Sequence, residues 1–250
     1  MSAIEPVAPG AAWADRAWAV TRDGRQLARL DLEAATGMFE LRLAGEAADA
    51  PGVAALLARL EPIGRVESVV PEEMTAVAGA LRAAGFTVER QVWQMEKRLG
   101  GAEPSPRWPP GVSVRTYEDS SDAAAVHGLL DVAFRAAHEV VAPFERWHER
   151  MTGDSEFDPS WWWLAERDGE LAGVALCWTS GWLKDLAVHP GARGQGLGEA
   201  LCRHAFREMA ARGVGQAGLK VDADNPTGAV RLYERVGMRR DRAFDLFVRS

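Results

Sequence analysis

Hydrophobic and polar positions in the second half of the chain predict strands joined by short turns. Apolar segments of strand length occupy residues 161–166, 171–178 and 183–188. Asp168-Gly169 separates the first two, and an Asp-Gly pair between apolar segments is a strong hairpin signal. We therefore expect an antiparallel sheet in this part of the chain.

After these strands the spacing of apolar residues changes to that of a helix. Apolar side chains recur three or four positions apart until Gly213 ends the run. They are Leu197, Leu201, Ala205, Met209 and Ala210. A strand over 217–221, a loop over 222–226 and a second helix over 228–236 follow, and Gly237 ends this helix. This order predicts an α/β fold built on a mixed sheet.

The first hundred residues repeat this order in a shorter form. Residues 18–32 read as a strand, an Asp-Gly turn and a strand, as residues 163–176 do. The pattern then predicts strands near 39–43 and 65–70, helices near 53–60 and 72–84, the pair Gly85-Phe86, and a long strand to about residue 99. We expect two related units in tandem, with an unrelated small α+β domain as the alternative for the first.

A segment rich in proline and glycine separates the predicted units. Residues 100–111 contain four prolines and three glycines, which exclude a helix or a central strand. We expect residues 1–99 to form the first domain, 100–111 a linker, and 112–250 the second domain.

A glycine-rich turn lies between the strand at 183–188 and the long helix. Gly194, Gly196 and Gly198 leave the backbone without Cβ atoms, and the unpaired N–H groups of a helix's first turn attract an anion. Arg193 adds a positive charge. This arrangement suits a pyrophosphate group.

Two other phosphate-binding motifs fit this turn less well. A phosphate loop requires Lys followed by Ser or Thr after the glycines, and neither pair follows here. A dinucleotide-binding fold requires an acid about 20 residues after the glycines. Asp222 and Asp224 lie too far along, and the strands before the turn are hairpin-like.

Two stretches of the chain resemble signatures of the GNAT superfamily of N-acetyltransferases. The first matches the acyl-CoA signature Arg/Gln-x-x-Gly-x-Gly/Ala and reads Arg193-Gly194-Gln195-Gly196-Leu197-Gly198. The second runs from Asn225 to Gly237, with Met238 where the family usually has Phe. The resemblance covers residues 112–250, and residues 221–225 and 232–234 are also similar to mycothiol-synthase-like tandem proteins. It implies the GNAT acyl-CoA N-acyltransferase fold.

The resemblance also implies catalytic roles. Tyr233 matches the family's proton donor to the departing thiolate, although a tyrosine here can also simply pack on the core. Asp185 interrupts an apolar strand and is the best candidate for the general base. The alternative is that Asp185 or Lys184 only marks the solvent face. Glu139, Glu145 and His148 lie where the family builds its acceptor pocket, and each is more typical of surface than of catalysis.

Acetyl-CoA is the co-substrate that the resemblance implies. The family splays two strands apart around the pantetheine arm, and backbone amides there serve as the oxyanion donor. The residues implied in binding acetyl-CoA are Leu186, Ala187, Val188, Arg193, Gly194, Gln195, Gly196, Leu197, Gly198 and Asn225.

The first unit resembles a degenerate, truncated GNAT-like domain from which the catalytic residues are absent. The stretch 44–52, where phosphate would bind, carries acids and no arginine. Aligning Gly85-Phe86 with Gly237-Met238 places Leu81 opposite Tyr233. We expect a structural role for this unit and one cofactor site per chain.

The amino-acid composition narrows the range of molecules that the protein is expected to bind. A net charge of −7 argues against nucleic acid and mildly favours a cationic amine. The five histidines and two cysteines are scattered, so no metal site is expected. No apolar stretch is long enough for a membrane span, and we expect a cytoplasmic monomer or homodimer with Cys177 and Cys202 as buried, reduced thiols.

The function expected from the sequence is transfer of an acetyl group from acetyl-CoA to a primary amine of a small molecule or peptide. The alternatives are a non-catalytic acyl-CoA sensor or assembly protein, and an acyltransferase that uses a longer acyl-CoA. Alternation along a strand places Trp161 and Trp163 on one face and Trp162 on the other. One face could form an aromatic wall for the substrate, but core packing is the commoner role of such residues.

Overall fold

The computed structural model describes residues 3–6, 17–22, 25–33, 38–43, 51, 65–100, 103–135 and 141–249. Four parts of the sequence-based expectation lie outside these residues: the Asp23-Gly24 turn, the helix near 53–60, nearly all of the acidic stretch 44–52, and Glu139. The chain divides into two compact units, residues 1–93 with 242–250, and residues 94–241.

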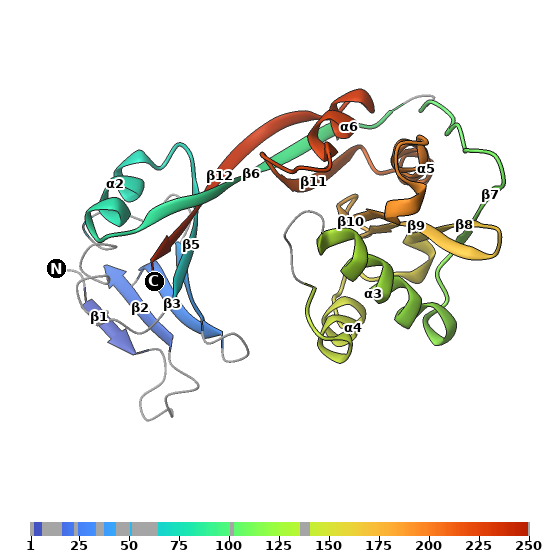
Figure 1. The fold of residues 1–250 in the computed structure, drawn as a ribbon. Helices are drawn as coiled ribbons and strands as arrows, with labels where there is room; N and C mark the ends of the chain where they lie inside the picture. The colour runs from blue at the N-terminus through green and yellow to red at the C-terminus, as the bar shows by residue number, and fades with distance from the viewer. Residues whose placement is uncertain are drawn as a thin grey trace. The chain divides into compact units, whose positions relative to one another are not determined.

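The first unit begins with antiparallel strands that continue into a parallel pair (Figure 1). The order β1 to β5 follows the chain, and β4 pairs with β5 in parallel through Phe39 with Val66 and Glu40 with Glu67. The strands are β1 (Ala3–Pro6), β2 (Ala17–Arg22), β3 (Arg25–Glu33), β4 (Met38–Leu43) and β5 (Val66–Pro71), followed by helix α2 (Thr75–Ala83). The predicted strands near 18–32, 39–43 and 65–70 and the helix near 72–84 are therefore present in the predicted order.

The second unit contains an antiparallel sheet in the order β10-β9-β8-β7. Its strands are β7 (Val112–Thr116), β8 (Trp162–Arg167), β9 (Glu170–Cys177) and β10 (Leu183–Val188). Asp168 and Gly169 join β8 to β9 with φ angles of 52° and 81°. Two successive positive φ angles are typical of a type I′ hairpin turn, so the predicted hairpin is confirmed.

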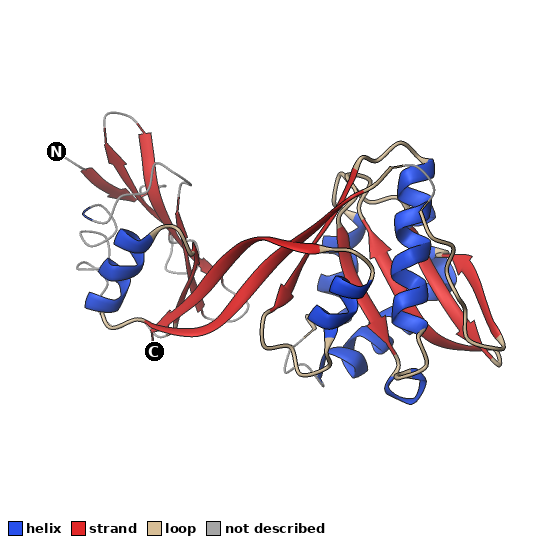
Figure 2. Cartoon of the chain, turned by 90° about the horizontal axis from the view of Figure 1, so that it is seen from above, coloured by secondary structure: helices blue, strands red, loops and turns tan. Residues whose placement is uncertain are grey.

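Helices cover both faces of this sheet (Figure 2). Trp163 contacts His204 of helix α5 (Leu197–Ala211), with ring centroids 5.5 Å apart. The neighbouring Trp162 faces the other way and contacts Trp147 of helix α4 (Phe144–Thr152) at 6.3 Å. Helix α3 (Asp119–Arg135) packs beside α4 and against β9 and β10. All three consecutive tryptophans are buried, which confirms their interpretation as core.

Three further strands belong to the eight-stranded sheet, whose order is β1-β2-β3-β4-β5-β12-β6-β11. They are β6 (Thr87–Arg98), β11 (Gln216–Asp222) and β12 (Arg239–Arg249), and helix α6 (Ala229–Arg235) lies between β11 and β12. The predicted domain boundary lies at residues 100–111, whereas the boundary between the two compact units lies inside β6 and inside β12. Apolar patterning predicts where a strand ends, but it does not predict that the two parts of one strand belong to different units.

The predicted linker, as far as it is described, contains neither helix nor strand. Arg207 of α5 donates a hydrogen bond to Ser105 Oγ at 2.8 Å, and the Trp108 ring lies 5.6 Å from that of His204. Lys97 forms an ion pair with Glu103. The segment is therefore held against the second unit.

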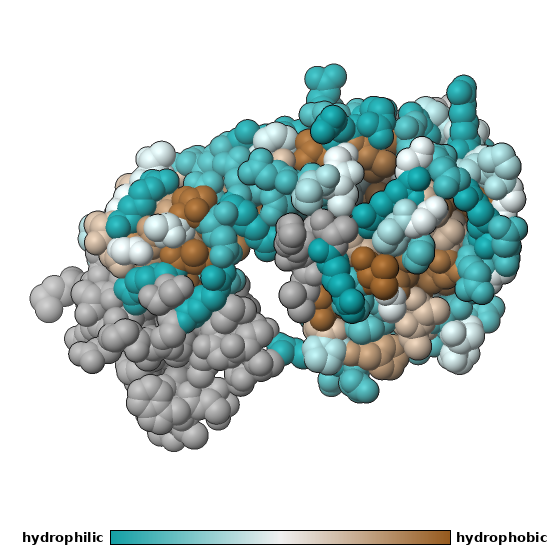
Figure 3. All heavy atoms as spheres, viewed as in Figure 1, coloured by the Kyte–Doolittle hydropathy of each residue, from teal (hydrophilic) through white to brown (hydrophobic). Residues whose placement is uncertain are grey.

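Hydrophilic residues cover most of the described surface that Figure 3 shows, with smaller hydrophobic areas over α2 and over α3 and α4. Large exposed hydrophobic residues among those described are Val69, Val88 and Val132. Cys177 and Cys202 are buried and unpaired, as predicted. No helix in the described residues is long and apolar enough to cross a membrane.

Candidate active site

Strands β10 and β11 touch at one point and then separate. A single parallel bridge joins Trp182 to Gly218, and the Gly218 N–H donates to Gly181 O at 3.1 Å. Beyond this bridge β10 pairs with β9 alone and forms the edge of its sheet. An edge strand presents unpaired N–H and C=O groups. The separation of these strands therefore leaves backbone groups of β10 available to a ligand.

Gly218 permits the close approach at this bridge. A Cβ atom placed on Gly218 would lie 2.6 Å and 2.7 Å from two ring atoms of Trp182. No side chain fits at such a distance, so only glycine lets the indole ring lie on the backbone of β11.

The hydrogen-bond pattern of β10 determines which of its amides face the open edge. The His189 N–H donates to Ala172 O at 2.9 Å, and antiparallel partners alternate between bonded and non-bonded pairs. Ala187 therefore directs its N–H toward β9. Leu186 and Val188 direct theirs away from β9, toward the open edge. Of the three backbone amides proposed from sequence, two face the space where the strands separate.

The glycine turn before α5 has the geometry expected of an anion site. Gly194 and Gly196 have φ angles of 73° and 86°, a left-handed conformation that favours glycine, and a Cβ atom on either would meet no atom within 4 Å. Gly196 is the N-cap residue of α5, and no side chain caps the helix there. The first-turn N–H groups of a 15-residue helix therefore lack a side-chain acceptor.

Gly198 serves a different purpose from the other two glycines. A Cβ atom on Gly198 would lie 3.2 Å from Leu232 Cδ1 of α6 and 3.5 Å from Val188 Cγ2 of β10. Its small size lets the first turn of α5 pack closely against both elements. Leu197 is buried beneath the turn as part of the core.

Arg193 directs side-chain donors at the protein's own backbone. Its Nε donates to Val188 O at 3.2 Å and its Nη2 donates to Ala133 O at 2.9 Å. These bonds join the end of β10 to the last turn of α3. The contacts that the structure gives to Arg193 are structural, and the charge remains close to the turn.

Tyr233 is a buried residue of α6. Its helix packs on the first turn of α5, because Leu232 contacts Gly198 and the Arg235 guanidinium lies 3.5 Å from the Glu199 carboxylate. The helix ends at Gly237, whose φ is 93°. Tyr233 is thus held on the helix adjacent to the glycine turn.

Asn225 caps the loop that leads into α6. Its Oδ1 accepts a hydrogen bond from the Thr227 N–H at 3.0 Å, an Asx turn that fixes the local backbone. This contact gives Asn225 a structural role in positioning α6. His189 is likewise a loop residue, whose Nδ1 accepts from the Gly191 N–H at 3.2 Å.

Asp185 lies on the face of the sheet that α3 and α4 cover. Strand register places Trp162, Leu176 and Asp185 in one row across β8, β9 and β10, and side chains of paired residues point to the same face. Trp162 contacts α4, so Asp185 faces the helices of the expected acceptor region. Its carboxylate oxygens lie 3.3 Å and 3.4 Å from Lys184 Nζ.

One polar network in this region was not predicted from the sequence. The Tyr117 hydroxyl donates to Asp119 Oδ1 at 2.6 Å, and His148 Nε2 lies 2.7 Å from the same oxygen. Burial, and then the bond to Asp119, raises the pKa of Tyr117. The bonds from Tyr117 and His148 lower the pKa of Asp119. His148 and Asp119 are 29 positions apart, and no sequence motif links them.

The described residues contain no group of three His, Cys, Asp or Glu side chains that could hold a metal ion.

Comparison with known proteins agrees with this geometry. Residues 124–238 match the family model described as Acetyltransferase (GNAT) family. The mycothiol acetyltransferase of Streptomyces avermitilis is 38% identical over 161 residues, covering 61% of this chain and 51% of that protein. That of Acidothermus cellulolyticus is 34% identical over 209 residues, covering 75% of this chain and 62% of that protein. The chain thus spans about half of the Streptomyces avermitilis relative and about three-fifths of the Acidothermus one.

Solved structures extend the similarity to both units. A GCN5-related N-acetyltransferase from Sphaerobacter thermophilus aligns with a TM-score of 0.78 at 26% identity, covering 96% of this chain and 82% of that one. A tandem GNAT protein from the clavulanic acid biosynthesis pathway shares the fold, with a TM-score of 0.67 at 18% identity over 99% of this chain and 83% of that one.

The mixed sheet, the separated strands and the glycine turn before α5 together define the GNAT fold, which confirms the predicted fold class. Residues 124–238 of the chain belong to the GNAT acetyltransferase family.

Proposed function

We propose that this protein is an N-acetyltransferase that transfers an acetyl group from acetyl-CoA directly to a primary amine of a small molecule or peptide. The observation that carries the proposal is the open edge of β10 beside the uncapped start of α5. The open edge of β10 suits the extended, amide-bearing pantetheine arm, and the uncapped start of α5 suits the pyrophosphate. The names of the curated relatives support acetyl transfer.

Binding of the co-substrate is assigned to backbone groups. The open space around Gly194 and Gly196 admits phosphate oxygens to the first-turn N–H groups of α5. Leu186 offers its N–H and C=O groups to the pantetheine arm, as a neighbouring strand would, and Val188 offers its N–H group because its carbonyl accepts from Arg193.

In the proposed reaction the amine nitrogen attacks the thioester carbonyl carbon. The new C–N bond forms through a tetrahedral intermediate, and the C–S bond then breaks. An outward-facing N–H of β10, from Leu186 or Val188, stabilises the oxyanion. Tyr233 donates its proton to the departing thiolate, and Asp185 accepts the proton that the amine loses. A carboxylate accepts several hydrogen bonds, so the Lys184 contact leaves Asp185 capacity for the amine.

The acceptor is proposed to approach from the side of α3 and α4, because Asp185 faces these helices. An acid at this position, with a net charge of −7 on the chain, favours a cationic amine over an anionic acceptor. A monomer or homodimer without nucleic-acid partners and a cytoplasmic location remain predictions.

A panel of primary amines tests the proposal. CoA release is followed with a thiol reagent, and the acetylated product is identified by mass spectrometry. We expect amine-dependent CoA release with acetyl-CoA. Acetyl-CoA binding without turnover of any amine would favour the sensor, and faster turnover of butyryl- or hexanoyl-CoA would favour the longer-chain acyltransferase.

A further inference from the structure

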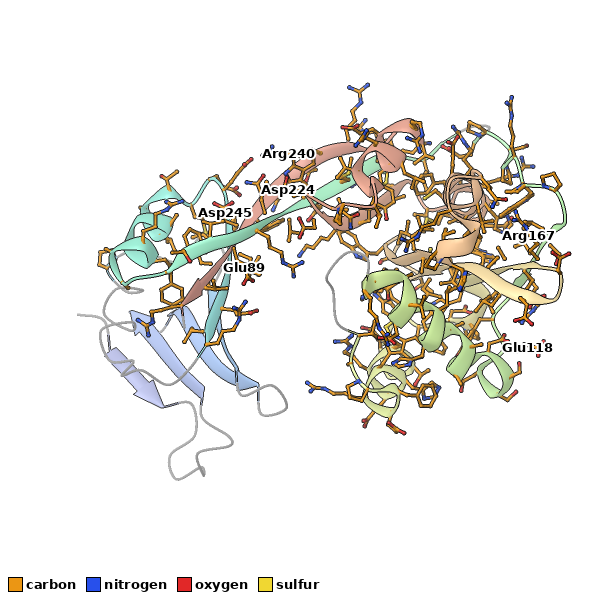
Figure 4. The ribbon with its side chains drawn as sticks, in the orientation of Figure 1. Glu89, Glu118, Arg167, Asp224, Arg240 and Asp245 are labelled. Atoms are coloured by element: carbon orange, nitrogen blue, oxygen red, sulfur yellow. The ribbon has the colours of Figure 1, made fainter. Side chains whose placement is uncertain are left out.

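Arg167 has a buried side-chain nitrogen without a partner. Its Nε is inaccessible to water and makes no hydrogen bond within the described part of the chain. Arg167 is the last residue of β8 and lies at the hairpin that joins β8 to β9 (Figure 4). A buried donor without an acceptor is unfavourable, so the protein alone does not satisfy all the donors of this guanidinium.

Gln195 holds this arginine against the glycine turn. Arg167 Nη1 donates to Gln195 Oε1 at 2.7 Å, and Gln195 Nε2 donates to Gly191 O at 3.4 Å. Gln195 lies between Gly194 and Gly196, the two glycines with open space around them. The guanidinium is therefore attached to the anion-binding turn by a side-chain contact that spans 28 positions of sequence.

Three other arginines near this site use donors within the protein. Arg193 donates to two backbone carbonyl groups, and Arg203 and Arg235 lie beside the Glu199 carboxylate. Among the residues that the structure describes, the Arg167 side chain bonds to Gln195 and forms no ion pair, although Glu170 is its cross-strand partner. Its positive charge is thus not neutralised by a close ion pair.

A phosphate group satisfies the requirements of such a guanidinium. Arginine presents a planar set of five N–H donors that matches the oxygen geometry of phosphate, and charge-assisted hydrogen bonds of this kind are strong. The hydrogen bond to Gln195 occupies one of these donors and Nε is inaccessible, so the remaining N–H groups of the two Nη atoms are the ones left for the anion.

We propose that Arg167, positioned by Gln195, is a phosphate-binding residue for the acyl-CoA. The inference rests on the proposed function, because it assigns to that same co-substrate a residue outside the family signature. Arg193 then supports the site structurally, and Arg167 supplies the side-chain contact to phosphate. Coenzyme A carries phosphate in two places, the pyrophosphate and the 3′-phosphate of the ribose.

Isothermal titration calorimetry with CoA, 3′-dephospho-CoA and pantetheine tests the proposal. The variants are Arg167→Gln, Arg167→Lys and the control Arg107→Gln. Arg107 is an exposed residue of the linker, two positions from Ser105. Ser105 contacts Arg207, which lies ten residues, or about 15 Å, along α5 from Leu197 at the start of the helix. Arg107 is therefore a control on a part of the linker that contacts α5 away from the glycine turn. Thermal unfolding of each variant verifies that the protein is folded.

We expect Arg167→Gln to weaken CoA binding about tenfold or more, because one charge-assisted contact is lost. Arg167→Lys should retain part of the affinity, and Arg107→Gln should stay within about twofold of wild type because exposed charges contribute little. Pantetheine, which lacks phosphate, should bind all variants equally. An equal loss for CoA and 3′-dephospho-CoA would assign the contact to the pyrophosphate, whereas a loss confined to CoA would assign it to the 3′-phosphate.

Unchanged CoA affinity in a folded Arg167→Gln variant, with normal binding to wild type, would overturn this inference alone. A wild-type protein that binds none of the three ligands would overturn the proposed function and this inference together.

Discussion

Helices α2 and α6 end in the same way, yet only one of them carries a tyrosine. The Phe86 N–H donates to Leu81 O at 3.0 Å, and the Met238 N–H donates to Tyr233 O at 3.0 Å. Each helix is followed by a left-handed glycine, with φ of 85° at Gly85 and 93° at Gly237. These are the bonds of a Schellman helix ending.

Leu81 and Tyr233 therefore occupy equivalent places in the two units, as the sequence alignment predicts. Both side chains are buried, so each of them contributes to the packing of its own unit. The hydroxyl group is present in the second unit alone. The shared ending of α2 and α6 thus indicates a common architecture of the two units. The difference in chemistry between them lies in the side chain, which is leucine in α2 and tyrosine in α6.

Replacement of Tyr233 should have the largest effect on activity of the substitutions that test this comparison. Tyr233→Phe removes the proposed proton donor and should lower kcat about 10²- to 10³-fold, the usual contribution of general acid catalysis. The affinity for acetyl-CoA should stay within about twofold, because the ring still packs. Leu81→Met is the matched control and should leave kcat unchanged. Steady-state kinetics and calorimetry measure both variants, and a Tyr233→Phe enzyme with wild-type kcat would remove Tyr233 from the mechanism.

The acids on the fourth strand of each unit extend the comparison. Asp185 lies on β10, and Glu40 lies on β4. Asp185→Asn should lower kcat about tenfold to a hundredfold at neutral pH, because the amine loses its proton acceptor. Glu40→Gln should have no such effect, and Lys184→Gln tests whether the neighbouring ion pair matters. Equal losses for Asp185→Asn and Lys184→Gln would indicate that the pair is structural.

Substitutions at two glycines with similar backbone conformations can distinguish an effect on ligand binding from an effect on stability. Gly196 and Gly213 have φ angles of 86° and 85°, and neither has an atom within 4 Å of an added Cβ. Alanine at either position should cost about 1–2 kcal/mol of unfolding free energy, the penalty of a left-handed residue. Only Gly196→Ala should also weaken acetyl-CoA binding, by about tenfold, since this one borders the proposed phosphate site. Similar affinities for the two variants would argue against that site.

The smallest expected effect is a difference between the two units in how their stability depends on pH. All five histidines follow residue 111, and burial lowers the pKa of His204 on α5. The folded state then favours neutral His204, so its stabilising contribution is complete above the unfolded pKa of about 6.5 and is lost as pH falls below it. The slope cannot exceed about 1.4 kcal/mol per pH unit for one proton.

Hydrogen exchange at pH 7.5 and 5.5 should therefore show weaker protection of the second unit at the lower pH. His204→Phe keeps an aromatic ring between Trp108 and Trp163 and should reduce this difference. A difference that persists unchanged would assign the acid sensitivity to the other titrating groups of the unit.

Local sequence patterns predicted much of the fold. The Asp168-Gly169 hairpin and the glycine that ends each helix depend on backbone conformations that few residues adopt, so they can be recognised from short stretches. The helix after Gly196 follows from apolar spacing. The placement of the glycine turn after β10 also agrees with the sequence.

Contacts between distant positions could not be predicted. The hydrogen bonds from Arg193 to Ala133 O and from Arg167 to Gln195 span 60 and 28 positions and follow no motif. The signature predicts Arg193 at the phosphate, and it does not predict that Nε and Nη2 of this residue donate to backbone carbonyl groups. The distribution of β6 and β12 between the two units likewise depends on strand pairing that periodicity does not encode.

The single bridge between Trp182 and Gly218 has a consequence for how the protein behaves without its ligand. Acetyl-CoA in the proposed site acts as a removable strand that completes the sheet edge at β10. Without acetyl-CoA the edge of β10 has no partner strand, and unpaired edges promote association between chains. Raising the acetyl-CoA concentration should therefore slow self-association of the protein as well as increase its turnover. The bound ligand occupies the same backbone groups that would otherwise pair with another protein molecule.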